Sequence, residues 1–276
     1  MIDLHCHSTA SDGLLAPAAV VEAARAAGLA ATALAGHGTP AGLGAARTAG
    51  DRLGVRVIGG CEFSVAAPWG EMHLLGYFIE PGDPAIERFL VEAREMRAAR
   101  AGAMLDRLQG LGVRIDRDDV LRESAGGAIG RPHVARALLR LGHVASVQAA
   151  FDRYIGRGRP AFVEKALPTF EAVTELVHAR GGVVSAAHLK SHGTRSVLAG
   201  LQARGLDAVE VRHPGHDGDR VAILTDAVLA LDLGRSGGSD WHGEDDPEGT
   251  HASLGSQQVP DAWLEDLEAR RPRVSA

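Results

Sequence analysis

Histidines and carboxylates recur at the ends of short apolar runs along most of this chain. The first run, residues 2–7, ends in His5-Cys6-His7, and the last, residues 235–242, ends in Asp240-Trp241-His242. Alternate side chains of a strand share a face, so the two ligand-type residues of each run are predicted to point the same way. Residues of the same types recur between these runs: Asp12, His37, Glu62, His73 and His188. A single histidine at a strand end is usually structural, but this repetition favours one shared metal site on a barrel rim.

The apolar runs alternate with segments of helical periodicity. Helices are predicted at 16–27 and 41–53, each followed or ended by a glycine. Strands are predicted at 2–7, 31–34, 55–65, 71–79, 182–188, 208–213 and 235–242. This alternation favours an α/β fold with a parallel sheet. An open doubly wound sheet is one alternative, but ligand-type residues at the carboxyl ends of nearly every strand suit a closed barrel, whose chemistry lies on that rim.

The middle of the chain has a different pattern. Residues 84–111 have the character of one long helix, and further helices are predicted at 134–141 and 146–154, with no strand-like run among them. We therefore expect a barrel in two parts, residues 1–82 and 166–276, with an all-helical insertion at 83–165.

Composition excludes several classes of protein. The formal net charge of −6 gives no reason to expect a broad electrostatic grip on long nucleic acid. Two cysteines, Cys6 and Cys61, argue against a disulfide-built secreted fold, and both are expected to be buried thiols rather than ligands. No leader and no apolar stretch of roughly 18 residues is evident, so we expect a cytoplasmic protein without membrane contact.

Imidazole and carboxylate ligands together suit borderline and hard divalent cations, namely zinc, manganese, iron or magnesium. The order of these ligands in the chain resembles the PHP (polymerase and histidinol phosphatase) family over almost the whole sequence. The motifs that carry the resemblance are Asp3-Leu4-His5-Cys6-His7-Ser8, Ser11-Asp12-Gly13, the turn at His37, Glu62, His73, His188 and Gly238-Ser239-Asp240-Trp241-His242.

Two secondary motifs, Gly130-Arg131-Pro132-His133 and Glu210-Val211-Arg212-His213-Pro214-Gly215-His216, are similar to the branch of stand-alone phosphoesterases with a helical insertion. That branch acts on 3′,5′-nucleoside bisphosphates or on the 5′ end of short oligoribonucleotides. The resemblance implies a small phosphorylated substrate for this chain as well.

The family resemblance implies a distorted, TIM-like (β/α)7 barrel that holds two to three divalent ions. A hydroxide bound to the metals would be the nucleophile. The implied ligands are His5, His7, Glu62 and Asp240 for one ion; Glu62, His73 and His188 for a second; and Asp12, His37 and His242 for a third.

One position departs from the pattern of that branch. The turn reads Ala35-Gly36-His37-Gly38-Thr39, whereas the branch usually has an aspartate where Gly36 stands. A carboxylate beside a liganding histidine commonly orients it, and its loss typically costs about 10–100-fold in affinity or activity. We therefore expect the third ion to bind weakly.

Substrate contacts are assigned from the secondary motifs. Arg131 and His133 precede a predicted helix, where a guanidinium can pair with a phosphate. His213 and His216 flank a Pro-Gly turn at a strand end and are candidates for binding phosphate or protonating the leaving group. Arg131, His213 and His216 are the candidate catalytic residues, and Arg131, His133 and His216 the candidate substrate-binding residues.

Several readings compete with a nucleotide phosphoesterase. A histidinol-phosphate phosphatase or a cyclic-phosphate hydrolase would use the same metal ligands. A degenerate PHP module with a structural or regulatory role is favoured only by Gly36. A metal-storage or sensing protein would not need the arginine at position 131.

Overall fold

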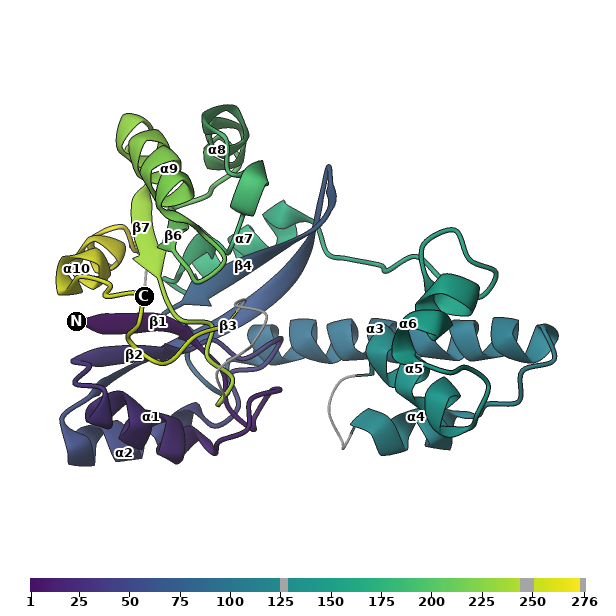
Figure 1. Cartoon of the computed structure of the whole chain (residues 1–276). Helices are drawn as coiled ribbons and strands as arrows, with labels where there is room; N and C mark the ends of the chain where they lie inside the picture. The colour runs from purple at the N-terminus through teal and green to yellow at the C-terminus, as the bar shows by residue number, and fades with distance from the viewer. Residues whose placement is uncertain (125–128, 244–250, 274–276) are drawn as a thin grey trace. The chain divides into compact units, whose positions relative to one another are not determined.

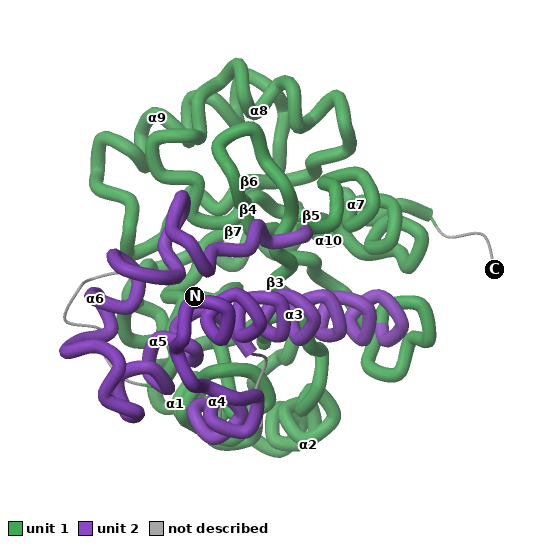
Figure 2. The backbone as a smooth tube through the Cα atoms, turned by 90° about the vertical axis from the view of Figure 1, so that its right-hand side faces the viewer, with its two compact units in different colours: residues 1–86, 167–276 green, residues 87–166 purple. Residues whose placement is uncertain are grey.

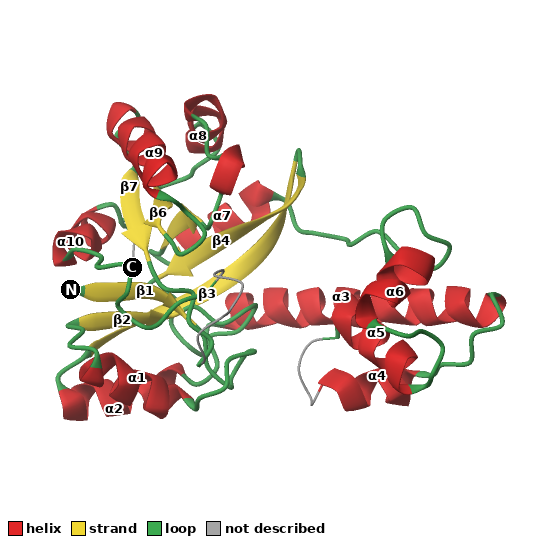
Figure 3. Ribbon diagram, viewed as in Figure 1, coloured by secondary structure: helices red, strands yellow, loops and turns green. Residues whose placement is uncertain are grey.

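The computed structural model describes residues 1–124, 129–243 and 251–273. Seven strands form one sheet in sequence order, and the sheet curls into a nearly closed barrel (Figure 1). The strands are β1 (Ile2–Cys6), β2 (Ala31–Leu34), β3 (Arg56–Ala67), β4 (Gly70–Tyr77), β5 (Val183–Ala186), β6 (Ala208–Arg212) and β7 (Gly234–Gly237). Helices lie outside the strands (Figure 3). The α/β barrel expected from the sequence is therefore present.

The sheet is not wholly parallel, so that expectation is wrong at β4. β3 pairs parallel to β2 through residues 56–59 and antiparallel to β4 through residues 60–67, and β4 is also antiparallel to β5. Only Pro68 and Trp69 connect β3 to β4, which is too short for the crossover that parallel strands need. Gly59 lies where β3 changes partner, and a Cβ there would approach the backbone oxygen of Ile79 to 2.1 Å.

Closure between the first and last strands depends on a loop. β7 ends at Gly237, earlier than predicted, so Asp240 and His242 are loop residues and are not aligned by strand alternation. The Asp240 backbone N–H donates to the His5 carbonyl over 2.8 Å. Buried Asp3 accepts N–H groups from Ser239 and Gly255, which ties this loop to β1. Ligand-type residues from both ends of the chain thus meet at one rim.

The outer helices of this unit are α1 (Pro17–Ala26), α2 (Leu43–Leu53), α7 (Phe170–His178), α8 (Arg195–Gln202), α9 (Gly218–Ala230) and α10 (Asp261–Ala269). α7, α8 and α9 begin with a side-chain cap, from Thr169, Thr194 and Asp217 respectively. Each such cap contributes about 1 kcal/mol. α2 ends at Gly54, whose φ of 70° is left-handed. α1 and α2 lie side by side, below β1 and β2 in Figure 1.

A second compact unit spans residues 87–166, shown in purple in Figure 2; the first unit comprises residues 1–86 and 167–276. The predicted insertion, 83–165, covers nearly the same segment. The helices of this second unit are α3 (Pro84–Gly110), whose first residues precede the unit, α4 (Arg117–Ser124), α5 (Arg131–Arg140), α6 (Val147–Ala150) and a π-helical turn at Phe151–Ile155. The sequence did not predict α4.

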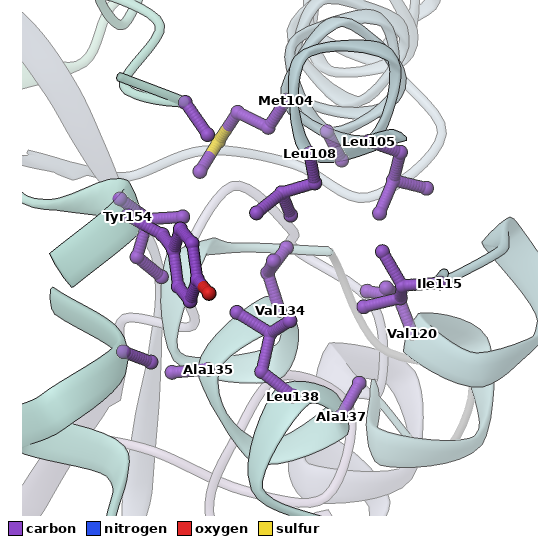
Figure 4. Packing of buried hydrophobic residues seen from close by; sticks show 14 of the residues in the cluster. Met104, Leu105, Leu108, Ile115, Val120, Val134, Ala135, Ala137, Leu138 and Tyr154 are labelled. Carbon is purple, nitrogen blue, oxygen red and sulfur yellow. The ribbon is translucent and has the colours of Figure 1, made fainter. Parts of the chain in front are cut away.

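This helical unit has its own apolar core. Met104 and Leu108 of α3 pack with Val134 and Leu138 of α5 and with Tyr154 (Figure 4). Burying one such aliphatic side chain contributes roughly 1.5–3 kcal/mol. In the described residues, no helix combines the length and apolar character needed to cross a bilayer.

Candidate metal centre

Glu62, on β3, is the centre of the histidine cluster and is 1% exposed. Its Oε1 lies 2.7 Å from His73 Nδ1 and 3.0 Å from His188 Nε2. Its Oε2 lies 3.0 Å from His37 Nδ1 and 3.4 Å from His5 Nε2. One carboxylate thus faces two groups of imidazoles through its two oxygens, which is the geometry of a bridging ligand.

Asp240 faces the first strand from the loop after β7. Its Oδ1 lies 3.2 Å from His5 Nε2 and 3.0 Å from His7 Nε2. The backbone φ of Asp240 is 51°, a left-handed value that few non-glycine residues adopt. Such strain is characteristic of functional sites, where the surrounding structure maintains it.

Asp12 defines the outer end of the cluster. Its Oδ1 lies 3.3 Å from His7 Nδ1 and 3.6 Å from His242 Nε2, and its Oδ2 lies 3.5 Å from His37 Nε2. The Ser11 hydroxyl accepts the His37 backbone N–H and donates to Asp12 Oδ1 over 2.7 Å. This hydroxyl therefore orients the loop at the place where Gly36 offers no carboxylate.

The structure brings every predicted metal ligand into this cluster. In the described residues, five sets of ligand atoms lie within 4.8 Å of one another. Three of them consist of predicted ligands: His5, His7, Glu62 and Asp240; His37, Glu62 and His73; and His7, Asp12, His37 and His242. The first and third sets contain the ligands implied for two of the ions. The second differs from the implied set because His37 takes the place of His188, whose Nε2 lies 3.0 Å from Glu62 Oε1.

The electrostatics are those of tightly coupled opposite charges. Burial alone would lower the pKa of His5, but Asp240, Glu210 and Glu62 raise it well above its usual value. Burial opposes charging of Glu62 too, yet His37 and His5 hold its pKa well below the normal range. Burial would lower the pKa of His73, but the hydrogen bonds that its ring donates to the carboxylates of Glu62 and Glu71 raise it to about 9. The carboxylates therefore stay ionised and are available to cations.

Several atoms fit a bound cation. Among the described residues, the buried Nδ1 and Nε2 of His7 and Oδ1 of Asp240 have no hydrogen-bond partner, although buried polar groups almost always have one. The Nδ1 of His5 faces Glu210 Oε1 at 2.9 Å, and the Nδ1 of His242 faces the Asp240 carbonyl at 2.7 Å. In the neutral rings that bind a metal, both contacts place the proton on Nδ1, which leaves the Nε2 lone pair for the ion.

Glu210 was not predicted as a site residue. It is fully buried on β6; its Oε1 contacts His5, and its Oε2 accepts the His188 backbone N–H over 2.8 Å. It thereby positions two candidate ligands at once. A signal was present in the sequence, because this glutamate interrupts the apolar run Val209-Glu210-Val211 and charged residues are rarely buried without partners.

His251 was also missed. Its Nδ1 lies 3.2 Å from Asp240 Oδ2, and its ring centroid lies 4.3 Å from that of His242. A histidine outside every strand and motif carries no periodic signal, so sequence patterns could not assign it.

The structure distinguishes the two histidines after β6. His213 Nδ1 accepts the Gly215 N–H over 2.9 Å, so Nε2 carries the proton of the neutral ring and points toward Asp240 Oδ2 at 3.5 Å. His216 Nδ1 donates to the Val211 carbonyl, and its Nε2 accepts the Lys190 N–H. Burial lowers the pKa of His216, in agreement with a neutral ring. Both nitrogens of His216 serve the backbone, which favours a structural role over the predicted substrate contact.

Arg131 and His133 lie in the helical unit. The Arg131 guanidinium stands 5.7 Å from the ring centroids of both Phe151 and Phe162. It lines a small pocket together with Arg97 and Arg100 of α3. His133 Nδ1 accepts the Gly130 N–H at the start of α5, so this nitrogen caps a helix.

A barrel rim that carries clustered imidazoles and carboxylates is typical of metal-dependent hydrolases. The family model described as the PHP domain matches residues 3–184, and the chain belongs to this family of metal-dependent phosphoesterases.

Relatives agree with this assignment. The chain is 33% identical over 245 residues to a 5′-3′ exoribonuclease from Haemophilus influenzae, covering 87% of this chain and 89% of the relative. It is 31% identical over 249 residues to a 3′,5′-nucleoside bisphosphate phosphatase from Chromobacterium violaceum, covering 87% of each. A solved Bifidobacterium adolescentis protein, assigned to the metal-dependent phosphoesterases, matches with a TM-score of 0.79 at 30% identity, over 99% of this chain and 97% of that one.

Proposed function

We propose that this chain hydrolyses phosphate esters of small nucleotides, either a 3′,5′-nucleoside bisphosphate or the 5′ end of a short oligoribonucleotide. The observation that carries the proposal is the position of Glu62, whose two oxygens face separate groups of imidazoles. Bound divalent ions, which we take to number two or three and to be manganese, zinc, iron or magnesium, would activate water and neutralise charge on the phosphate.

The roles of the side chains follow from their contacts. Glu62 and Asp240 supply negative charge between the imidazoles, while Glu210 holds the His5 ring in the tautomer that binds a cation through Nε2. His213, with its proton on Nε2 near Asp240, is our candidate donor to the leaving oxygen. Nδ1 of His213 accepts the Gly215 N–H, so in the neutral ring the proton is on Nε2, on the side of Asp240.

Arg131 is our candidate for binding a substrate phosphate that is not cleaved. Three arginines line its pocket, and a guanidinium pairs well with phosphate oxygens. His133 is a weaker candidate, because one of its nitrogens already serves the helix cap.

The test is manganese-dependent phosphate release from adenosine 3′,5′-bisphosphate, compared with histidinol phosphate, a cyclic nucleotide phosphate and a 5′-phosphorylated short RNA. We expect the bisphosphate or the RNA to give the highest kcat/KM. Preference for histidinol phosphate or the cyclic ester would replace the nucleotide assignment. No turnover of any of these esters by the metal-loaded protein would favour a structural module instead.

A further inference from the structure

Two aromatic rings stack on each other on two segments that also carry candidate metal ligands. Trp69 lies at the tip of the β3–β4 hairpin, and His192 ends a short 3-10 helix, Lys190–His192, that follows β5. The ring centroids are 4.6 Å apart and the planes differ by 6°. Two separate segments therefore meet through a nearly parallel aromatic contact.

The stacked pair is accessible to solvent. His192 is exposed and Trp69 is half-buried, while its neighbours Pro68 and Gly70 are exposed. An indole has a surface of roughly 150–250 Å² that is usually buried in cores and interfaces. A tryptophan presented by an exposed two-residue turn is thus a ready surface for a flat ligand.

The segments that form the stack also carry candidate metal ligands. His73 lies four residues from Trp69 along β4, a distance of about 14 Å at roughly 3.4 Å per strand residue. His188 lies four residues before His192. Both imidazoles contact the same oxygen of Glu62. The stack is therefore farther from the cluster than one phosphate can reach, but at a distance that suits an extended nucleotide.

A lysine, Lys190, lies between His188 and His192 in the sequence. Lys190 is exposed, and its Cε is 3.2 Å from the position that a Cβ on Gly215 would take, so it lies over the loop that holds His213. The backbone φ values of His188 and Lys190 are 28° and 49°. This strained segment places an imidazole, an ammonium and an aromatic ring within five residues.

That order matches the chemical order of a nucleotide: a phosphate, then a sugar with its second charged group, then a flat base. We infer that Trp69 and His192 form the platform on which the base of the substrate stacks, an assignment that rests on the proposed function. It predicts that phosphate esters with an aromatic base bind more tightly than esters without one, such as glycerol 3-phosphate.

The competing explanation is that the stack only fixes the hairpin against the β5 loop. The two explanations differ for a substrate without a ring. A base platform affects only nucleotides, whereas a displaced hairpin would move His73 and weaken all substrates.

The experiment compares Trp69→Ala with Trp69→Phe and with Pro68→Ala, which changes the same turn but keeps the indole. For Trp69→Ala we expect KM for adenosine 3′,5′-bisphosphate to rise by roughly 5- to 100-fold, the range for loss of one base-stacking contact. Glycerol 3-phosphate, a phosphate ester without a ring, is the second substrate. Its KM, and the kcat for both substrates, should stay unchanged in Trp69→Ala. Trp69→Phe should retain most of the affinity, and Pro68→Ala all of it.

A second measurement does not depend on turnover. Adenosine, which has no phosphate, should quench the tryptophan fluorescence of the metal-loaded wild-type protein. The quench should be lost in Trp69→Phe, although Trp241 and Trp263 still emit. An equal rise in KM for both substrates, or an unchanged quench, would overturn the platform. If the wild-type protein turns over no ester, the proposed function fails, while adenosine quenching still decides the platform.

Discussion

The inner and outer parts of the metal centre are built differently. The inner ligands His5, His7 and Glu62 are at most 1% exposed and lie on or directly after strands. At the outer end, the side chains of Asp12 and His37 are 50% and 31% exposed and lie in loops.

This difference teaches how strongly each position should hold a cation. Buried ligands on strands lose little freedom when a metal binds, because packing already fixes their rotamers. Ligands on exposed loops must be ordered at the moment of binding. We therefore expect tight inner ions and a weak outer ion, which is the order that Gly36 suggested from the sequence.

The largest effect is expected at the shared carboxylate. Glu62→Gln keeps the shape but removes the charge between the two groups of imidazoles. Because metal ions contribute several kcal/mol to such reactions, we expect phosphate release to fall by about 10³-fold or more. Inductively coupled plasma analysis should show that the variant has lost the two ions whose implied ligand sets share Glu62.

Asp12→Asn is the matched control for Glu62→Gln, since it removes the same charge at the outer end. It should lose only the outer ion and a smaller part of the activity. Equal losses from the two variants would contradict the division of the centre into a strong and a weak part.

A smaller effect is expected from a residue behind the inner ligands. Glu210→Gln should reduce manganese affinity and kcat about 10–100-fold, because the carboxylate no longer holds the His5 ring proton on Nδ1. Isothermal titration calorimetry would measure the affinity. Asp207→Asn, on a carboxylate that contacts His178 away from the cluster, is the control and should change neither quantity.

Protons should compete with the inner metal. With a pKa of about 9 in the metal-free protein, His73 holds a proton below that pH. Its contribution to folding is complete below the unfolded pKa of about 6.5, and is lost as pH rises from there toward 9. Melting temperatures of the metal-free protein should therefore fall over that window, and less so for His73→Gln. A steeper fall in the variant would show that another group governs the trend.

The smallest effect is expected from restoring a carboxylate at the outer end. Gly36→Asp should raise occupancy of the outer ion by a few-fold at most, because a carboxylate near His37 typically contributes tenfold or more but Ser11 already orients that loop. Its Cβ would lie 3.1 Å from Ser11 Cβ and from the Thr39 carbonyl oxygen, so the turn must yield slightly. Gly44→Asp, in open space on α2, is the control. If wild type and Gly36→Asp both bind the outer ion fully, the predicted difference in affinity between the inner and outer ions is wrong.

Local residue patterns and the repetition of ligand-type residues were enough to predict most helices and strands and the metal ligands that cluster around Glu62. Period and glycine ends placed most helices and strands, and the recurrence of ligand types identified the residues that meet around Glu62. The strand at β4 was predicted, but its antiparallel direction was missed because strand periodicity does not depend on direction. Only the two-residue link at Pro68 pointed to a hairpin.

Other features depend on contacts between distant residues. The tautomer of His5 is set by Glu210, which lies 205 positions away. The backbone bonds that occupy His216, and the ion pair between His251 and Asp240, likewise need the folded chain. No pattern along the sequence reports such pairings, so the side chains that orient the ligands were the least predictable part of the site.

The barrel joins its first strand to a loop near residue 240, and that has a consequence for biosynthesis. The amino-terminal part leaves the ribosome first, carrying His5, His7 and Glu62 without their last partner. The nascent chain can complete its inner cation cage only after Asp240 has emerged and Gly238 has settled against His5, where even one added carbon would collide at 2.4 Å. Maturation of the centre is thereby delayed until the loop near residue 240 has been translated.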